Sequence, residues 1–175
     1  ANAVDVVKKL PNKNIFFIPD KHLGSYVATK LPEKNIILCK GYCPIHDGVN
    51  LKDVTELKNK YPKAQIMVHP ECSQEILNLA DYIGSTSGII NYVSNSQNND
   101  FIICTEVGIL YELKAKNPNK NFYSPEKRME CLDMKKTTLD KIIHVLETEE
   151  NEIILDSIIA EQAKKPLDKM LELGR

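Results

Sequence analysis

Several segments of this chain run apolar and then end in polar side chains of the kinds that bind ligands and metals. The five segments are IFFIPDKHLG, NIILCKGYCPIHD, QIMVHPEC, YIGSTSG and FIICTEVG. In open α/β sheets, ligands bind beyond the carboxyl ends of the parallel strands. If the apolar runs are strands, one edge collects the polar residues that follow them: Asp20, His22, Cys43, His46, His69, Glu71, Ser85, Thr86, Ser87, Thr105 and Glu106. This layout is typical of a catalytic α/β scaffold.

Two of the five cysteines have local sequences that suit metal or cluster binding. Cys43 lies in the turn GYCPIH, and Cys131 precedes a predicted helix. A thiolate in such a turn or at a helix start has a lowered pKa and is a good ligand. A buried, inert thiol is the alternative for both. It is the favoured interpretation for the cysteines within or at the ends of apolar runs, which are Cys39, Cys72 and Cys104. No CxxC pair is present, which disfavours a zinc ribbon.

The HPEC segment places an imidazole and a carboxylate where a strand ends. Pro70 denies the strand a further N–H and leaves His69 and Glu71 at the turn. An imidazole paired with a carboxylate can work as general acid and base, or hold a substrate hydroxyl or amine. The alternative is a histidine bonded to a backbone carbonyl and a glutamate that caps the next helix.

The GSTSG segment predicts an anion site where a strand passes into a helix. Ser85, Thr86 and Ser87 offer hydroxyls beside the free amides of the helix N-terminus, which suits a carboxylate or a phosphate. The segment lacks the lysine and the length of a P-loop, so it does not imply a nucleoside triphosphate. A simple N-cap is the alternative. For Asp20, His22, Thr105 and Glu106, structural roles such as helix capping are favoured over direct chemistry.

These side chains need a parallel sheet to bring them together, and the sequence predicts one. The predicted strands are rich in Ile, Val and Phe and lack strict polar alternation, as expected for strands covered on both faces. They span 14–18, 35–39, 65–69, 82–84, 101–105 and 121–124. Helical patterns alternate with them over 23–31, 50–60, 73–80, 86–97 and 106–116. Strand and helix in alternation indicate a parallel α/β fold.

The two ends of the chain are helical. Val4, Val7 and Leu10 are spaced for one buried face of a helix that is already under way at the first residue, so we expect a missing upstream part. A helix over 138–148 is expected to turn inward its apolar residues Ile142, Ile143 and Leu146. NEIILD is expected to be a short strand or a helix lead-in. A final amphipathic helix spans 156–173, with a kink near Pro166.

The composition and charge of the chain exclude some classes of binding partner. The chain has 175 residues, 42% of them hydrophobic, and 23 basic residues nearly balance 24 acidic ones. Without a basic stripe, nucleic acid is an unexpected partner. No apolar run approaches the roughly 20 residues that span a bilayer, and no secretory segment opens the chain. We therefore expect no membrane partner and a cytoplasmic location, where an odd set of five cysteines serves as thiols and metal ligands.

The order of the motifs resembles the quinolinate synthase family. The motifs are ANAV, PDxxLGxYVA, GxCxxH, HPEC, GSTSG, CTEVG and a late Cys followed by MK. The resemblance covers the whole chain but only about the later three-fifths of the family's usual length. It implies condensation of iminoaspartate with dihydroxyacetone phosphate to quinolinate, in de novo NAD biosynthesis. It also implies a [4Fe–4S] cluster held by three cysteines, one from each of three αβα domains around a pseudo-threefold axis, with the fourth iron open as a Lewis acid.

Carried onto this sequence, the resemblance makes Cys43 and Cys131 cluster ligands and leaves the third cysteine upstream of Ala1. Cys72 is not a ligand. The resemblance also makes His69 and Glu71 the catalytic, substrate-contacting pair. Further substrate contacts would come from Asn2, Ser85, Thr86 and Ser87. An enzyme that oxidises L-aspartate would supply the iminoaspartate. Two cysteines cannot hold such a cluster, so this chain alone is expected to be inactive.

The resemblance further implies an α/β architecture of three-layer αβα modules with parallel sheets, in which two of the three domains are represented. Residues 1–46 would be the end of an incomplete middle domain. Residues 47–130 would be a complete domain, and residues 131–175 a helical segment that returns to the missing first domain.

Two other functions stay open. One is a non-enzymatic α/β module that binds a small dicarboxylate or phosphate at Ser85–Ser87 without a cluster. The other is a thiol-dependent or zinc enzyme that uses Cys43 with His46 or His69.

Overall fold

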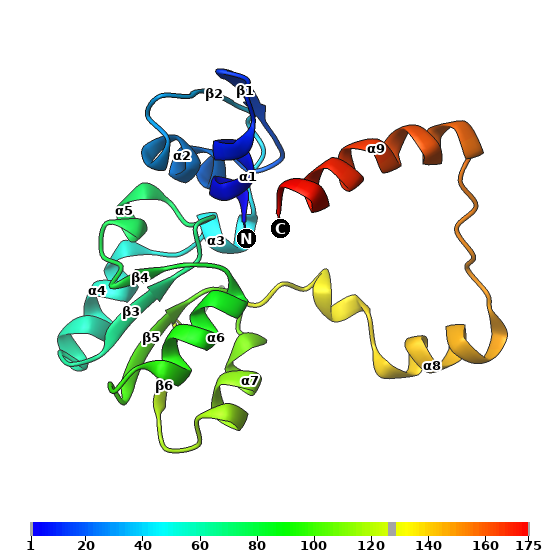
Figure 1. Ribbon diagram of the computed structural model, residues 1–175. Helices are drawn as coiled ribbons and strands as arrows, with labels where there is room; N and C mark the ends of the chain where they lie inside the picture. The colour runs from blue at the N-terminus through cyan, green and yellow to red at the C-terminus, as the bar shows by residue number, and fades with distance from the viewer. Residues whose placement is uncertain (1, 126–128, 175) are drawn as a thin grey trace. The chain divides into compact units, whose positions relative to one another are not determined.

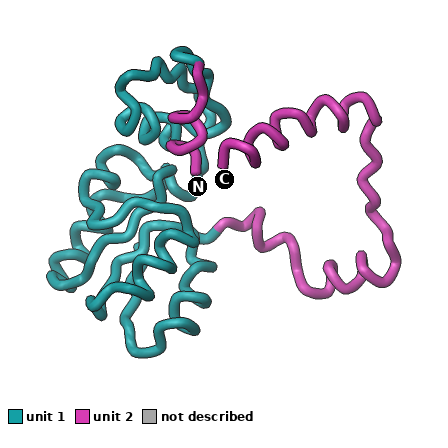
Figure 2. Tube along the Cα trace, in the orientation of Figure 1, with its two compact units in different colours: residues 1, 12–130 teal, residues 2–11, 131–175 magenta. Residues whose placement is uncertain are grey.

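The computed structural model describes residues 2–125 and 129–174. It divides into two compact units (Figure 2). The first, called here the sheet unit, comprises residues 12–130. The second, the helical unit, comprises residues 2–11 and 131–175.

The sheet unit begins with a small parallel sheet. Strand β1 (Asn14–Phe17) pairs in register with β2 (Asn35–Leu38), and α2 (Lys21–Lys30) connects them. The helix lies close to the sheet at Gly24, where an added Cβ would stand 2.5 Å from Leu38 Cδ2 and 2.9 Å from Phe17 Cδ1. A larger residue at this position would force these two side chains to shift. Asp20 is the N-cap of α2.

A four-stranded parallel sheet forms the rest of the unit. Its order is β4 (Tyr82–Ile83), β3 (Gln65–Val68), β5 (Asp100–Cys104) and β6 (Asn121–Tyr123). Alternate residues of its central strands point to opposite faces, as strand geometry requires. Ile66, Val68 and Ile102 join one buried cluster, whereas Phe101 and Ile103 join the other.

Helices cover both faces of this sheet (Figure 1). Helices α4 (Leu51–Lys60) and α5 (Gln74–Leu77) contribute Val54 and Ile76 to the first cluster. Helices α6 (Thr86–Asn95) and α7 (Ile109–Lys116) contribute Ile89 and Leu113 to the second. The predicted α/β class with parallel sheets and three layers is confirmed.

The element boundaries of the sheet unit agree with the predicted ranges to within a few residues, and one helix of this unit was not predicted. The short helix α3 (Pro44–Asp47) follows Cys43, with Pro44 at its first position. Proline is favoured there because its fixed φ suits a helix start and its missing N–H is not needed.

The helical unit consists of α1 (Ala3–Lys9), the 3₁₀ turn η1 (Met134–Lys136), α8 (Leu139–Thr148) and α9 (Ser157–Leu173). Helices α1 and α9 pack together, and Lys9 Nζ donates a hydrogen bond to Leu173 O at 2.6 Å. Val7 is buried, as the spacing of the first helix predicts. Helix α9 continues through Pro166.

Two predictions for this unit are wrong. Ile142, Ile143 and Leu146 do not point into a core, because 46%, 44% and 75% of their surfaces are exposed and α8 has no buried residue. The NEIILD segment forms neither strand nor helix before Ser157. In both cases the apolar residues have no layer of described residues against which to pack. Within the described part of the chain, no helix combines the length and apolarity needed to cross a membrane.

Candidate functional site

The site lies at the carboxyl edge of the four-stranded sheet. Because its strands are parallel, the residues after β3 and β5 meet at one edge: His69 follows β3, and Thr105 follows β5. The backbone N–H of His69 donates to Cys104 O at 3.2 Å and continues the ladder beyond the strands. The sheet therefore holds these residues on a rigid base.

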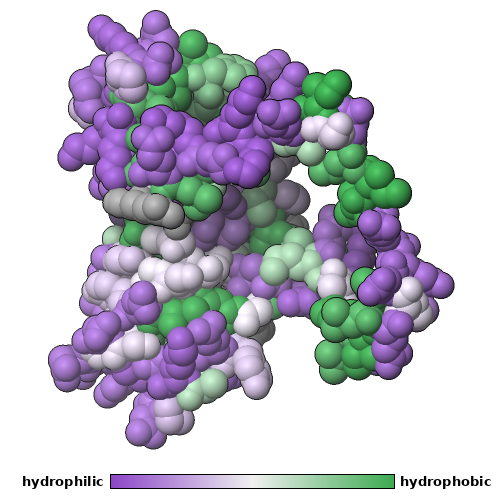
Figure 3. Space-filling view, turned by 45° about the vertical axis from the view of Figure 1, so that its right-hand side comes forward, coloured by the Kyte–Doolittle hydropathy of each residue, from purple (hydrophilic) through white to green (hydrophobic). Residues whose placement is uncertain are grey.

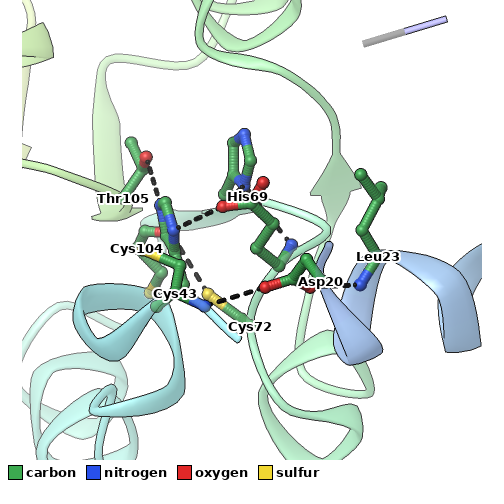
Figure 4. A network of polar contacts seen from close by, with 9 residues as sticks. Asp20, Leu23, Cys43, His69, Cys72, Cys104 and Thr105 are labelled. Carbon is green, nitrogen blue, oxygen red and sulfur yellow. Dashed lines mark hydrogen bonds and ion pairs between the residues drawn. The ribbon is translucent and has the colours of Figure 1, made fainter. Parts of the chain in front are cut away.

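Asp20 holds the turn that carries Cys43. Its carboxylate accepts hydrogen bonds from Leu23 N at 2.7 Å and from Cys43 N at 2.8 Å (Figure 4). The first bond caps α2, and the second fixes the backbone of the cysteine. Asp20 is only 5% exposed, so both bonds are shielded from water. The position of Cys43 is therefore fixed by the buried carboxylate of Asp20 as well as by the turn in which Cys43 lies.

His46 connects the α3 turn to the edge of the large sheet. It follows Cys43 by one helical turn, and its Nε2 lies 3.0 Å from the hydroxyl of the fully buried Thr105. Its Nδ1 lies 3.0 Å from Glu71 Oε2. The ring also stacks on that of His69, with centroids 4.3 Å apart and planes inclined by 17°. Two imidazoles and one carboxylate therefore stand together beside the thiol of Cys43.

The protonation states follow from these contacts. The contact with His46 lowers the pKa of Glu71 more than burial raises it, so Glu71 is ionised at neutral pH. Burial lowers the pKa of His69 to about 4, and the neighbouring His46 adds to the shift. His69 Nδ1 accepts a hydrogen bond from Glu71 N at 3.3 Å. His69 is therefore neutral, and its proton is on Nε2.

The other two cysteines near the edge differ from Cys43. Cys72 and Cys104 are fully buried, and Cys72 Sγ contacts Cys104 O at 3.6 Å. Burial raises the pKa of both thiols, that of Cys104 to about 12. Cys43 is only half-buried. Of these three thiols, Cys43 is the one that a ligand can reach.

Cys43, His46 and Glu71 could hold a metal. One ligand atom from each, a sulfur, a nitrogen and an oxygen, lies within 4.8 Å of the other two. A thiolate, an imidazole and a carboxylate are the groups that bind zinc and similar ions.

The GSTSG segment lies where predicted, between β4 and α6 and at the same edge of the sheet. Ser85 is the N-cap of α6, and its hydroxyl accepts a hydrogen bond from Gly88 N at 3.1 Å. Thr86 and Ser87 are exposed in the first turn. The capping alternative therefore describes Ser85, while two hydroxyls remain available to a ligand.

The remaining candidates have structural contacts or lie in the other unit. His22 Nε2 lies 2.6 Å from Asp47 Oδ1, and this contact lowers the pKa of Asp47. Glu106 accepts a hydrogen bond from Gly108 N at 2.7 Å as α7 begins. Asn2 and Cys131 belong to the helical unit, so their part in the site stays a prediction.

Sequence reasoning gave too little weight to His46. His46 was predicted to lie at the functional edge and was given a chemical role only in the thiol or zinc enzyme alternative, although the structure places its ring between Thr105 and Glu71. The available signal was the spacing from Cys43, since three residues make one turn of the short helix behind Pro44. Its contact with Thr105 crosses 59 residues of sequence and could not be inferred from local pattern.

The fold and this site define an α/β protein whose thiol, imidazole and carboxylate groups meet at the carboxyl ends of parallel strands. The model of the family described as "Quinolinate synthetase A protein" matches residues 1–172. The chain is 50% identical to quinolinate synthase of Clostridioides difficile and 51% identical to those of Sulfurihydrogenibium sp. and Fusobacterium nucleatum. Each match covers 99% of this chain and 57% or 58% of the relative. The chain belongs to the quinolinate synthetase A family and spans less than two thirds of the length of these relatives.

Proposed function

We propose that this chain is part of a quinolinate synthase, which condenses iminoaspartate with dihydroxyacetone phosphate and releases phosphate and water. This would place it in de novo NAD biosynthesis, in the cytoplasm. An enzyme that oxidises L-aspartate would supply its iminoaspartate. The observation that carries the proposal is the contact of His46 with Glu71, beside Cys43, in a chain of this family.

Cys43 and Cys131 are the proposed ligands of a [4Fe–4S] cluster, and the third cysteine would lie outside this chain. The donor set fits this group, because Cys43 is half-buried in a turn fixed by Asp20, whereas Cys72 and Cys104 are sealed in the core. When bound, the cluster would supply a Lewis acid for dehydration.

Glu71 and His69 would move protons for the condensation. Glu71 is ionised, so its Oε2 can take a proton from a substrate carbon or nitrogen. His46 holds this oxygen in place through its contact at 3.0 Å. His69 is neutral and carries its proton on Nε2, so it can donate a hydrogen bond to a substrate oxygen. The stacked imidazoles keep both groups at one edge of the sheet.

Thr86 and Ser87 would bind a carboxylate or the phosphate of the substrates. They are exposed in the first turn of α6, where backbone amides point outward and favour an anion. Ser85 would support them as the cap. Asn2 is a further proposed substrate contact.

Turnover of the Glu71→Gln variant tests the proton-transfer role. We expect it to lower the rate of quinolinate formation by roughly 10²–10⁴-fold and to leave cluster content unchanged, because only the base is lost. The assay needs the complete protein. Glu75→Gln is the matched control, since Glu75 is exposed on α5. Unchanged turnover in Glu71→Gln would remove this role.

Iron and sulfide content, measured anaerobically with the intact mass, tests the cluster. We expect Cys43→Ser and Cys131→Ser each to abolish the cluster absorbance. Retained cluster content would exclude the mutated residue as a ligand. A protein without iron that still binds a small dicarboxylate or phosphate would favour the binding-module alternative.

A further inference from the structure

We propose that the start of α2 clamps the short helix α3, and that His22 and Asp47 are positioning residues for the Cys43 thiol and the His46 ring. The clamp consists of residues 20–22, which contact both ends of α3. Its effect on turnover rests on the proposed function, whereas its effect on the turn of Cys43 does not.

Helix α3 is too short to fix its own orientation. It is closed by backbone hydrogen bonds from Asp47 N to Cys43 O at 2.9 Å and from Gly48 N to Pro44 O at 3.1 Å. Isolated helices shorter than about 12 residues are marginal in water, because fixing the first turn costs more than its hydrogen bond returns. The position of α3 therefore depends on contacts with other elements.

The first end of α3 is held through the turn that precedes it. Asp20 accepts a hydrogen bond from Cys43 N at 2.8 Å, and Lys21 N donates one to Gly41 O at 2.7 Å. The ammonium group of Lys21 also lies 4.2 Å from the centroid of the Tyr42 ring. Three consecutive residues of the turn therefore contact the start of α2.

The last residue of α3 is held by its carboxylate. Asp47 Oδ1 lies 2.6 Å from His22 Nε2 and 3.3 Å from Lys21 Nζ. The contact with His22 lowers the pKa of Asp47, so the carboxylate is ionised and accepts the Nε2 proton. The side chains of His22 and Asp47 are only 16% and 34% exposed. A charge-assisted hydrogen bond that is partly shielded from water is stronger than a contact on the open surface.

The clamp acts on the site through the residues next to it. Asp47 directly follows His46, whose Nδ1 lies 3.0 Å from Glu71 Oε2. A shift of α3 would move the His46 ring away from Glu71 and would move the thiol of Cys43 with it. Misplacement of a reacting group by about 1 Å can lower turnover by roughly 100-fold. Loss of His22 or Asp47 should therefore lower turnover through the position of α3.

Alkylation of the complete protein without its cluster, resolved by cysteine, tests the clamp. Iodoacetamide labelling followed by mass spectrometry gives one rate for each thiol. We expect Asp47→Ala and His22→Leu to raise the rate at Cys43 by about tenfold, because local opening of the turn exposes this half-buried thiol. The rates at the fully buried Cys72 and Cys104 should stay unchanged, because these thiols report opening of the large sheet.

Conservative variants separate the contact from the loss of a side chain. Asp47→Asn keeps an acceptor and His22→Gln keeps a donor, so both should stay closer to the wild-type rate at Cys43 than Asp47→Ala and His22→Leu. Glu112→Ala is the matched control, because it removes an ion pair with Lys116 on α7. It should leave every alkylation rate unchanged.

Turnover per cluster in the complete enzyme tests the positioning role itself. Asp47→Ala should lower the rate of quinolinate formation per cluster by about 10–100-fold, and Glu112→Ala should not change it. Division by cluster content removes any effect of lost cluster from this comparison.

Three results would overturn the proposal. Cys43 could react at the wild-type rate in both Asp47→Ala and His22→Leu. Cys72 and Cys104 could become reactive in parallel with Cys43, which would show general loosening of the sheet unit. Turnover per cluster could also stay unchanged in Asp47→Ala. A complete protein without iron would overturn the proposed function instead, and the alkylation rates would still decide whether the clamp holds the turn of Cys43.

Discussion

Two helices with similar apolar patterns have different surroundings in the two units. In α6, Ile89, Ile90 and Val93 are at most 8% exposed and pack on the large sheet. In α8, Ile142 and Leu146 have comparable spacing, yet 46% and 75% of their surfaces are exposed. The difference shows that an amphipathic pattern marks the face that will be buried when a partner is present. It does not supply the partner.

The rest of the helical unit extends this contrast. Green atoms mark its apolar surface on the part of the chain that carries α8 (Figure 3). The large hydrophobic residues that are exposed on this unit are Leu132, Met134, Leu139, Ile142, Ile143, Val145, Leu146, Ile153, Ile154, Leu155, Ile158, Ile159, Leu167, Met170 and Leu171. By contrast, the sheet unit buries polar groups as well as apolar ones, including Asp20, His46 and Thr105. Most of the stability of the chain should therefore reside in the sheet unit.

The largest expected effect is at the centre of the large sheet. Ile102→Ala should reduce the free energy of unfolding by about 2–5 kcal/mol, because Ile102 is fully buried and the change leaves a cavity. Ile154→Ala is the matched control, with a side chain that is 85% exposed in the helical unit, and should cost less than about 0.5 kcal/mol. Urea unfolding measures both. If both variants lowered the free energy of unfolding equally, the two units would not differ in packing as described.

A second effect depends on pH and comes from the buried imidazole of His69. Its pKa is lowered to about 4 in the folded chain, whereas an unfolded histidine titrates near about 6.5. Between these values the unfolded chain binds the proton first, so the free energy of unfolding should decrease as pH falls. The loss should reach up to about 3 kcal/mol in the metal-free chain. His69→Gln should reduce the slope above about pH 5, and an unchanged slope would rule out this cause.

A third comparison uses two aspartates that cap helices. Asp20 is buried and accepts from Leu23 N and Cys43 N, so Asp20→Ala should cost about 2 kcal/mol by leaving two partly buried donors without an acceptor. Asp156 is exposed and accepts from Ile158 N and Ile159 N, so Asp156→Ala should cost about 1 kcal/mol or less. Thermal unfolding of both variants measures the difference. If Asp156→Ala lowered the free energy of unfolding more than Asp20→Ala, the conclusion that the sheet unit is the more stable region would be wrong.

The smallest expected effect is on the exposed face of α8. Leu146→Gln should change the free energy of unfolding by less than about 0.5 kcal/mol, because the side chain is 75% exposed. Val93→Thr on α6 is the contrasting change, since Val93 is fully buried and the hydroxyl would enter an apolar cluster. A substantial cost for Leu146→Gln would show that α8 is covered in solution.

Much of the sheet unit could be predicted from local pattern. The predicted strands 65–69 and 101–105 have the apolar cores IMV and FIIC, and polar residues follow each core, so both the parallel sheet and its functional edge could be inferred. The helices between them were predicted to within a few residues. The short α3 was missed because four residues carry no periodicity.

The sequence by itself determined which residue types stand at the strand ends and which helix faces are apolar, because both depend on neighbours in the chain. Its motifs were also sufficient to indicate the family. The tertiary structure alone decided that His46 joins Thr105 and Glu71, and that Asp20 holds Cys43, because these contacts join residues 23–59 positions apart. It also decided that the apolar face of α8 is exposed in the described part of the chain, because burial requires a second surface that no local pattern provides.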